Sequence, residues 1–182
     1  MRAAASRLPL LVVVLPLARA WLAGAAPKIA CAARAHAFAT AALPLPDADA
    51  PPEQVVFYCM DALKNNDEPS KDAGKRLNWE LGSDMLRGIH KGALDNFLSW
   101  SNKSPVFSCM VDCERFTVDA DSITLVPGTM TRGGLAKMKV VTIKDGRERS
   151  FLWTLQQQRM PPQRWLLYQV MAIDKAFEMT RG

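Results

Sequence analysis

The sequence predicts an α+β domain in which about three helices come first and pack on an antiparallel sheet of four to five strands. Before residue 105 the apolar residues recur at helical spacing, whereas after it they alternate along extended segments. Turn-forming pairs such as Asp145-Gly146 separate the extended segments, and this pair is typical of a tight β-hairpin. Helices and strands that are segregated along the chain are characteristic of α+β folds.

The helical half of the domain is predicted from apolar stripes and from residues that begin or end helices. Pro51 or Pro52 suits the first turn of a helix, because a proline there loses no hydrogen bond. The segments expected are a helix over 52–66, a short helix or turn over 72–79, a helix over 85–89 capped by Ser83 or Asp84, and a helix over 91–100, with Pro105 closing the helical half.

The strand half is predicted from alternating apolar residues and from the turns between them. We expect extended segments over 107–111 and 113–118, a turn over 119–122, and a strand over 123–126 that pairs back on the first. Prolines and glycines between 127 and 134 indicate a loop. Further strands are expected over 135–144, 150–158 and 164–173.

The last predicted strand is apolar on both of its faces. Strict alternation places Trp165, Leu167, Gln169, Met171 and Ile173 on one face and Leu166, Tyr168, Val170 and Ala172 on the other. An antiparallel strand with one face in water would instead alternate apolar and polar residues. The face away from the helices is therefore expected to be covered by curvature of the sheet or by another subunit, and we predict a homodimer through the sheet.

The net charge of +5 does not indicate a nucleic-acid-binding protein. All 18 acidic residues lie at or after Asp47, whereas five of the 23 basic residues precede residue 41. The remainder of the chain therefore has 18 basic and 18 acidic residues and carries no net charge. Basic charge confined to one end is typical of a targeting segment, so we expect no nucleic-acid partner.

Residues 1–20 have the features of a signal peptide. A basic start precedes a short apolar run and a small-residue cleavage pattern, with Ala20 and Trp21 on either side of the cut. The apolar run over 8–17 is too short to span a bilayer, so we expect no transmembrane anchor in the mature protein.

Residues 21–46 have the composition of a transit peptide followed by a linker, ahead of a single domain over 47–182. This stretch is basic and free of acid, and Ala37 and Phe38 mark an alternative cut. A signal peptide followed by an aromatic residue and a basic, acid-free stretch resembles the bipartite plastid-targeting sequence of algae with complex plastids. That resemblance implies an algal plastid, with secretion or mitochondrial import as the alternatives.

The cysteines indicate neither a disulfide framework nor a metal site. Outside the targeting segment there are three, Cys59, Cys109 and Cys113, an odd number. The last two have a spacing that resembles half of a zinc site, but only His90 is left to complete the four ligands that such a site needs. We expect small core residues here, with no metal and no cofactor.

Several short motifs occur in an order that resembles a known family. The segment Ala62-Leu63-Lys64-Asn65-Asn66-Asp67 is followed by Asp72-Ala73-Gly74, by Leu77-Asn78-Trp79-Glu80-Leu81-Gly82-Ser83, and by Asn96-Phe97 ahead of Ser104-Pro105. Over roughly residues 51–175 this order resembles the nuclear transport factor 2-like (SnoaL-like) domains, including plastid-targeted members of plants and algae.

The resemblance implies a cone-shaped fold, in which a curved sheet wraps around the helices and encloses a pocket, commonly in a dimer. The family includes isomerases, dehydratases, hydrolases, transport adaptors and non-catalytic pockets, so it does not select a function.

Few titratable residues suit catalysis. The enzymes of the resembled family use His–Asp or Tyr–Asp pairs, whereas here His90 is the single histidine of the domain and is expected at an exposed helix junction. Tyr168 on the last strand offers a phenolic hydroxyl. Asp112 and Glu114 lie two apart on one extended segment, so both would face the same way and perturb each other's pKa, unless they form a solvated edge.

An apolar cavity is expected among large side chains that equally suit an ordinary core. They are Trp79, Phe97, Trp100, Met110, Trp153, Trp165 and Met171. Two functions follow as hypotheses. The first is a non-catalytic plastid protein that binds a small apolar ligand or a protein partner. The alternative is a small-molecule isomerase, dehydratase or hydrolase.

Overall fold

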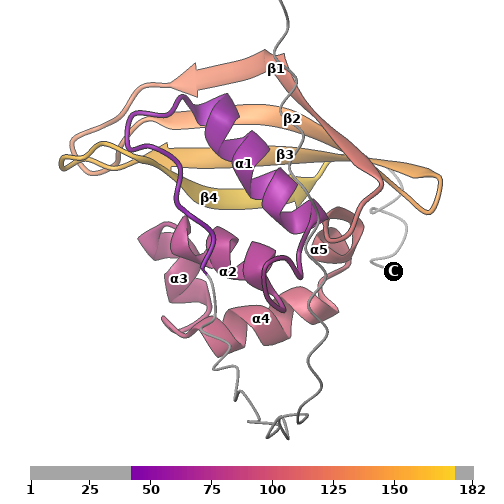
Figure 1. Ribbon diagram of the computed structural model, residues 1–182. Helices are drawn as coiled ribbons and strands as arrows, with labels where there is room; N and C mark the ends of the chain where they lie inside the picture. The colour runs from indigo at the N-terminus through magenta and orange to yellow at the C-terminus, as the bar shows by residue number, and fades with distance from the viewer. Residues whose placement is uncertain (1–41, 175–182) are drawn as a thin grey trace, which may run out of the picture. The chain divides into compact units, whose positions relative to one another are not determined.

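The computed structural model describes residues 42–174, in which five helices and four strands form an α+β domain (Figure 1). In chain order they are α1 (Pro52–Lys64), α2 (Ala73–Glu80), α3 (Asp84–Ile89), α4 (Leu94–Lys103), α5 (Pro105–Met110), β1 (Arg115–Val126), β2 (Leu135–Lys144), β3 (Arg147–Gln157) and β4 (Trp165–Ala172). The strands form one antiparallel sheet in the order β1-β2-β3-β4. The α+β class is confirmed. The predicted cleavage sites, and the predicted targeting segment as far as residue 41, lie outside the described residues.

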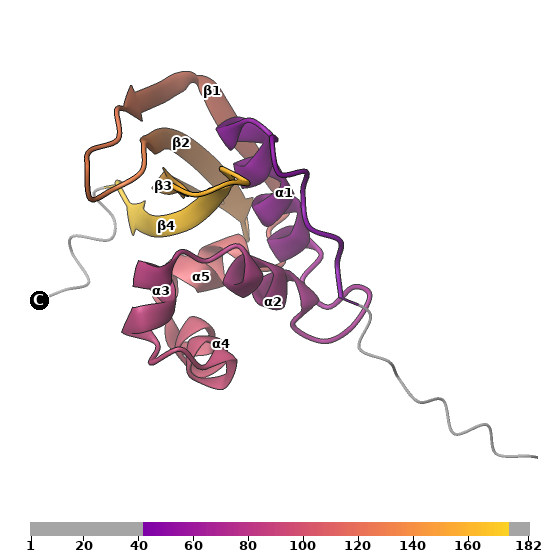
Figure 2. The same cartoon turned by 90° about the vertical axis from the view of Figure 1, so that its left-hand side faces the viewer.

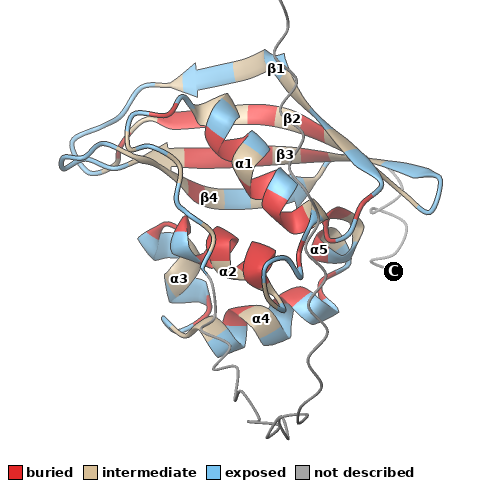
Figure 3. Cartoon of the chain, in the orientation of Figure 1, coloured by how far each residue is buried: buried red, intermediate tan, exposed pale blue. Residues whose placement is uncertain are grey.

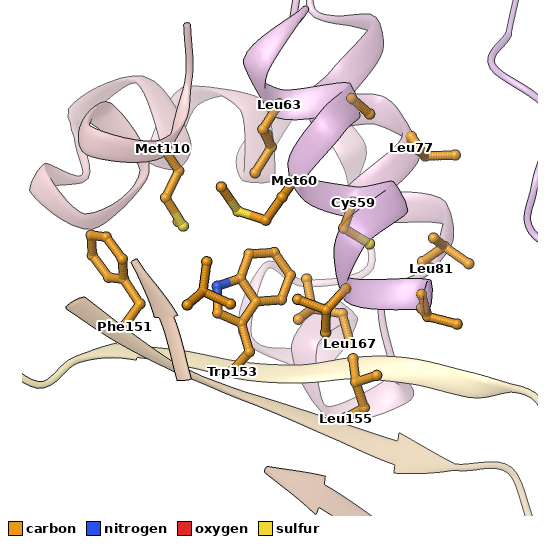
Figure 4. Packing of buried hydrophobic residues seen from close by; sticks show 14 of the residues in the cluster. Cys59, Met60, Leu63, Leu77, Leu81, Met110, Phe151, Trp153, Leu155 and Leu167 are labelled. Carbon is orange, nitrogen blue, oxygen red and sulfur yellow. The ribbon is translucent and has the colours of Figure 1, made fainter. Parts of the chain in front are cut away.

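The core lies between the helices and one face of the sheet, as the turned view and the burial colouring show (Figures 2 and 3). Helix α1 contacts β1, α5 contacts β2 and β4, and α3 contacts β4, whereas α4 packs mainly on α2 and α5. Phe151, Trp153 and Leu155 of β3 are fully buried and face Met60 of α1 and Met110 of α5 (Figure 4). Within the part of the chain that the structure describes, no helix is both long and apolar enough to cross a membrane.

The short helix α5 covers residues 107–110 of the segment predicted to be extended, so that prediction was wrong. Ser104 caps this helix, because its Oγ accepts a hydrogen bond from the Phe107 N–H at 3.4 Å. Pro105 therefore begins a helix instead of closing the helical half. At the other end, the ammonium of Lys144 on β2 donates to two main-chain carbonyl oxygens at 2.8 and 2.6 Å.

The predicted turn over 119–122 is also absent from the described chain, and β1 continues through it as a single strand. Both halves of β1 pair with β2, and the register shifts between Asp119 and Thr124. The hydroxyl of Ser122 donates to the Asp119 carbonyl at 2.7 Å and accepts from the Lys139 N–H at 2.8 Å. These hydrogen bonds of the Ser122 side chain replace main-chain bonds between β1 and β2. The residues between Asp119 and Thr124 therefore form an irregularity within β1, and they do not form a hairpin turn.

Helix α4 begins at Leu94, three residues later than predicted. Lys91 and Gly92 have φ values of +55° and +68°, which are left-handed conformations incompatible with a continuing right-handed helix. They form the turn that separates α3 from α4.

The last strand, β4, contains a β-bulge at Tyr168, the extra residue between its pairs with β3. The bulge interrupts the strict alternation that the sequence analysis predicted. Leu167 and Val170 pack toward the core, whereas Gln169 and Met171 are exposed. The predicted assignment of faces was therefore wrong beyond Tyr168.

The segment that leads into α3 pairs with β4. The Ser83 N–H donates to the Leu167 carbonyl at 2.8 Å, and the Leu167 N–H donates to the Leu81 carbonyl at 2.7 Å. Gly82 and Leu167 thus form a parallel bridge, which fixes the start of α3 to the edge of the sheet.

The motif residues around positions 62–78 have a packing role. Asn78 is fully buried, and its amide donates to the carbonyls of Cys59 at 3.2 Å and Gly74 at 2.9 Å. Gly74 lies against the end of α1, where an added Cβ would stand 2.0 Å from the carbonyl oxygen of Ala62. The main-chain N–H of Gly74 donates to the Asn66 carbonyl at 3.0 Å. These contacts hold α1 and α2 together.

A buried lysine joins α2 to α4. The Lys75 side chain is 8% exposed, and its ammonium lies 2.8 Å from Asp72 Oδ1 and 2.8 Å from Asn102 Oδ1. Burial raises the pKa of the Asp72 carboxyl, but the hydrogen bond and charge of Lys75 outweigh this effect, so the pKa lies below its usual value.

We expect the substitution Asp72→Asn to lower the free energy of unfolding by about 1–3 kcal/mol at neutral pH, because it leaves the buried Lys75 charge without its counterion. Asp72 also has a left-handed φ of +59°, which asparagine tolerates. Since the pKa is lowered in the folded state, the ion pair stabilises fully above the ordinary value of 3.8 and is lost as the pH falls below it. Urea unfolding across the acid range should show a flatter pH dependence in the variant. Parallel curves for the variant and the parent protein would contradict this account.

Candidate functional site

The candidate site is a small pocket between α3 and β4, with a volume of about 160 Å³. We call it the α3–β4 pocket. Three polar side chains line it: His90, Tyr168 and Gln169. Its other walls are apolar and consist of Met85, Leu86, Ile89, Trp100, Phe107, Leu167 and Val170.

The bridge and the bulge on β4 together form this pocket. Ser83, which pairs with β4, also caps α3 by accepting from the Leu86 N–H at 3.3 Å. Consecutive residues of a regular strand point to opposite faces. Here four consecutive residues, 167–170, line one pocket, because the bulge lies among them and the pocket wraps the edge of the strand.

His90 is buried in an aromatic cluster, so the prediction of an exposed histidine was wrong. The residue is 6% exposed, and its ring centroid lies 4.9 Å from that of Trp100 and 5.3 Å from that of Phe97. Trp79 and Phe107 complete the cluster, which joins α2, α4 and α5 behind the pocket. Burial lowers the pKa of His90, so the imidazole is neutral at neutral pH.

The polar groups of the pocket are available to a ligand. Among the described residues, neither the His90 imidazole nor the Tyr168 hydroxyl has a hydrogen-bond partner. A neutral imidazole has one donor and one acceptor nitrogen, and a phenol can do both. The arrangement can therefore bind and orient a small molecule that carries a hydrogen-bonding group.

The apolar residues proposed as pocket walls separate into two groups. Trp79, Phe97, Met110 and Trp153 are buried in the core. The other three are Trp100, which is 43% exposed at the α3–β4 pocket, Trp165, which lines a cavity at the end of the sheet, and Met171, which is exposed on β4. Of the seven, only Trp100 lines the α3–β4 pocket with His90 and Tyr168, although Phe97 and Trp79 also pack near His90.

Asp112 and Glu114 do not lie on an extended strand, so their prediction as a strand pair was wrong. Asp112 has a φ of +53° in the turn after α5, and its N–H donates to the Leu63 carbonyl at 3.0 Å. The Glu114 carboxylate accepts from the Gly146 N–H at 3.1 Å and so supports the β2–β3 hairpin. Neither residue lines the α3–β4 pocket with Tyr168.

The cysteines offer no reactive thiolate in the interior. Burial raises the pKa of the Cys59 thiol to about 12, and burial also raises that of Cys113. Among residues 42–174, no group of three or more candidate ligands could hold a metal ion.

A larger cavity of about 600 Å³ lies beside α1, but its tyrosine is already engaged. Leu43, Tyr58 and Asp61 are among the residues that line it. The Tyr58 hydroxyl donates to the Pro44 carbonyl and holds the linker against the helix. Because the hydroxyl of its tyrosine serves packing, this cavity is a weaker candidate than the α3–β4 pocket.

Comparison with protein-family models, with curated proteins and with solved structures finds no match. The chemistry of the pocket itself is therefore the basis for a function.

Proposed function

We propose that the chain is a plastid-targeted, non-catalytic protein with a nuclear transport factor 2-like domain, and that it binds a small, mostly apolar ligand in the α3–β4 pocket. The observation that carries this proposal is that two polar groups without a hydrogen-bond partner among the described residues, on His90 and Tyr168, line one pocket that has apolar walls and is open to solvent. Apolar pockets with a few convergent polar groups are the usual form of small-molecule sites.

The volume of the pocket limits the size of the ligand, and the hydrogen-bonding groups of the pocket limit its chemistry. About 160 Å³ is below the range of roughly 300–1,000 Å³ that is common for drug-sized ligands. The pocket therefore suits one or two fused rings, or the apolar end of a longer molecule. A ligand with one donor or acceptor would bond to His90 or Tyr168, and Trp100 would cover its flat face.

The same pocket also supports the alternative of a small-molecule isomerase, dehydratase or hydrolase. Two titratable groups, His90 and Tyr168, line one cavity. A neutral imidazole can accept a proton from a bound substrate, and a phenol can donate one. The non-catalytic proposal is preferred because no carboxylate lies among the described residues of the pocket to orient the histidine.

Two further parts of the proposal concern the oligomeric state and the subcellular localisation. The exposed Met171 and Ile173 near the outer edge of the sheet support a homodimer through that face, and light scattering of the full chain measures it. The composition of residues 1–46 supports import into a plastid, and a fluorescent-protein fusion of this segment tests it.

Saturation-transfer NMR with indole and its hydrocarbon analogue indene tests the pocket in the full chain. We expect indole to bind more tightly, because only indole donates a hydrogen bond to the neutral His90. The variant His90→Phe should weaken indole binding by about 2- to 10-fold, the value of one neutral hydrogen bond, whereas Tyr168→Phe should change it little because indole has a single N–H. Tyr58→Phe is the matched control, since it removes a tyrosine hydroxyl outside the pocket, and it should leave binding unchanged. Equal binding of indole in all three variants would exclude the pocket.

A further inference from the structure

A second cavity, of about 470 Å³, is lined by the β1–β2 loop and the β3–β4 turn. Both connections lie at the same end of the sheet, at the left of Figure 1. We call it the loop pocket. The polar and aromatic side chains that could contact a ligand in this pocket are Arg132, Gln157, Gln158, Arg159, Gln163 and Trp165. None of them lines the α3–β4 pocket, so the two cavities are separate.

The two loops are tied to each other, which gives the loop pocket a fixed floor. The Gln157 N–H donates to the Gly134 carbonyl at 2.8 Å and so joins the two loops, while the Gln158 N–H donates to the Arg164 carbonyl at 2.8 Å and closes the β3–β4 turn. Gly133 lies so close to β3 that an added Cβ would stand 1.8 Å from the Gln157 carbonyl oxygen. The glycines thus allow a close approach of two backbones, and the cavity exists before any ligand arrives.

The charge of the loop pocket is positive and unneutralised. Arg132 and Arg159 both line it, and neither forms an ion pair with a described residue. No described residue that lines it is acidic. Arg132 is held in place by a bond from its Nη2 to the Pro127 carbonyl at 3.4 Å, while its Nε is buried without a hydrogen-bond partner. Two guanidinium groups in one cavity without a carboxylate attract an anion.

We propose that the loop pocket binds a phosphate monoester, with the phosphate between Arg132 and Arg159 and the organic part against Trp165. Guanidinium groups bond to phosphate through paired N–H donors, and the three glutamine amides add further donors. This number of donors exceeds what the two oxygens of a carboxylate can use, which favours phosphate. The volume lies within the range of small-molecule sites and leaves room beyond the phosphate for a ring.

Isothermal titration calorimetry of the full chain tests this site with three probes: phenyl phosphate, inorganic phosphate and phenol. Phenyl phosphate should bind most tightly, because it alone offers both the anion and the ring. Arg132→Gln and Arg159→Gln should each weaken its binding by about 10-fold or more, as expected for hydrogen bonds to a charged group. Arg132→Lys should retain part of the affinity, since it keeps the charge but loses the paired donors. Lys103→Gln on α4 removes the same charge outside the pocket and should have no effect.

Three outcomes would overturn the proposal. The first is the absence of saturable phenyl phosphate binding at millimolar concentration. The second is unchanged binding in the double variant of Arg132 and Arg159. The third is inorganic phosphate binding as tightly as phenyl phosphate, which would leave a site for free phosphate and no role for Trp165. Circular dichroism of each variant separates a lost site from a lost fold.

Discussion

Replacement of Gly74 by alanine is expected to lower the free energy of unfolding by about 3 kcal/mol or more, at the upper end of the cost of overpacking. The added Cβ would lie 2.0 Å from the Ala62 carbonyl oxygen and 2.6 Å from its carbonyl carbon. Both atoms belong to the backbone of α1, so no side chain can move aside to make room. Relief requires α1 and α2 to separate, which breaks the hydrogen bond from the Asn78 amide of α2 to the Cys59 carbonyl of α1.

The matched control is Gly88→Ala on α3. An added Cβ at Gly88 meets no heavy atom within 4 Å. Alanine there should raise the stability of the protein by about 0.5–1 kcal/mol, because glycine is a poor residue in a helix. Urea unfolding of the two variants measures effects of opposite sign. A Gly74→Ala protein as stable as the parent would show that the two helices are less closely packed than the structure indicates.

The substitution Trp153→Ala is expected to cost about 3–5 kcal/mol, as is typical of a large aromatic residue lost from a core. Trp153 is fully buried at the centre of the space between β3 and α1 (Figure 4). Met60, Met110 and Leu167 surround the indole, and they come from α1, α5 and β4. One truncation therefore leaves a cavity that touches both layers of the domain.

Trp153→Phe separates packing from hydrogen bonding at this position. The indole Nε1 is buried and has no hydrogen-bond partner among the described residues. Phenylalanine therefore loses no bond, and it should cost less than half as much as alanine. Trp100→Ala, at a position 43% exposed, should also cost less than Trp153→Ala. Equal losses for Trp153→Phe and Trp153→Ala, by chemical or thermal unfolding, would show that the indole N–H contributes a bond that the packing does not reveal.

The parts of the fold that the sequence predicts well are those with a long, regular signal. The helix predicted over 52–66 forms α1, and the strand predicted over 135–144 forms β2. Asp145 and Gly146 have φ values of +51° and +66°, the left-handed pair that a tight hairpin turn requires.

The errors fall where the local signal is short or ambiguous. Helix α5 has six residues, too few to show a helical period, and Ser104-Pro105 is equally typical of a chain that ends one helix and begins another. The bulge at Tyr168 leaves no mark in the sequence, since it depends on how β4 pairs with β3 and with the segment before α3.

For the candidate site, the sequence indicated which residues have suitable side-chain chemistry. It did not indicate which of those residues line the same pocket. His90 and Tyr168 were candidates because they are rare in this domain and titratable. Their presence in one pocket depends on the bond between Ser83 and Leu167, which no pattern encodes. Gln169 of the first pocket and Arg159 of the second carry no motif, so only the three-dimensional arrangement identifies them.

The bridge between Gly82 and Leu167 makes the position of α3 depend on the last strand, β4. Helix α3 has six residues, too few to be stable alone, and its anchor is the last strand of the sheet. Because a chain is synthesised from its N-terminus, α3 emerges long before its anchor does. The α3–β4 pocket therefore cannot form before β4 has been synthesised, and a chain that stops short of β4 lacks this pocket even where its first helices have formed.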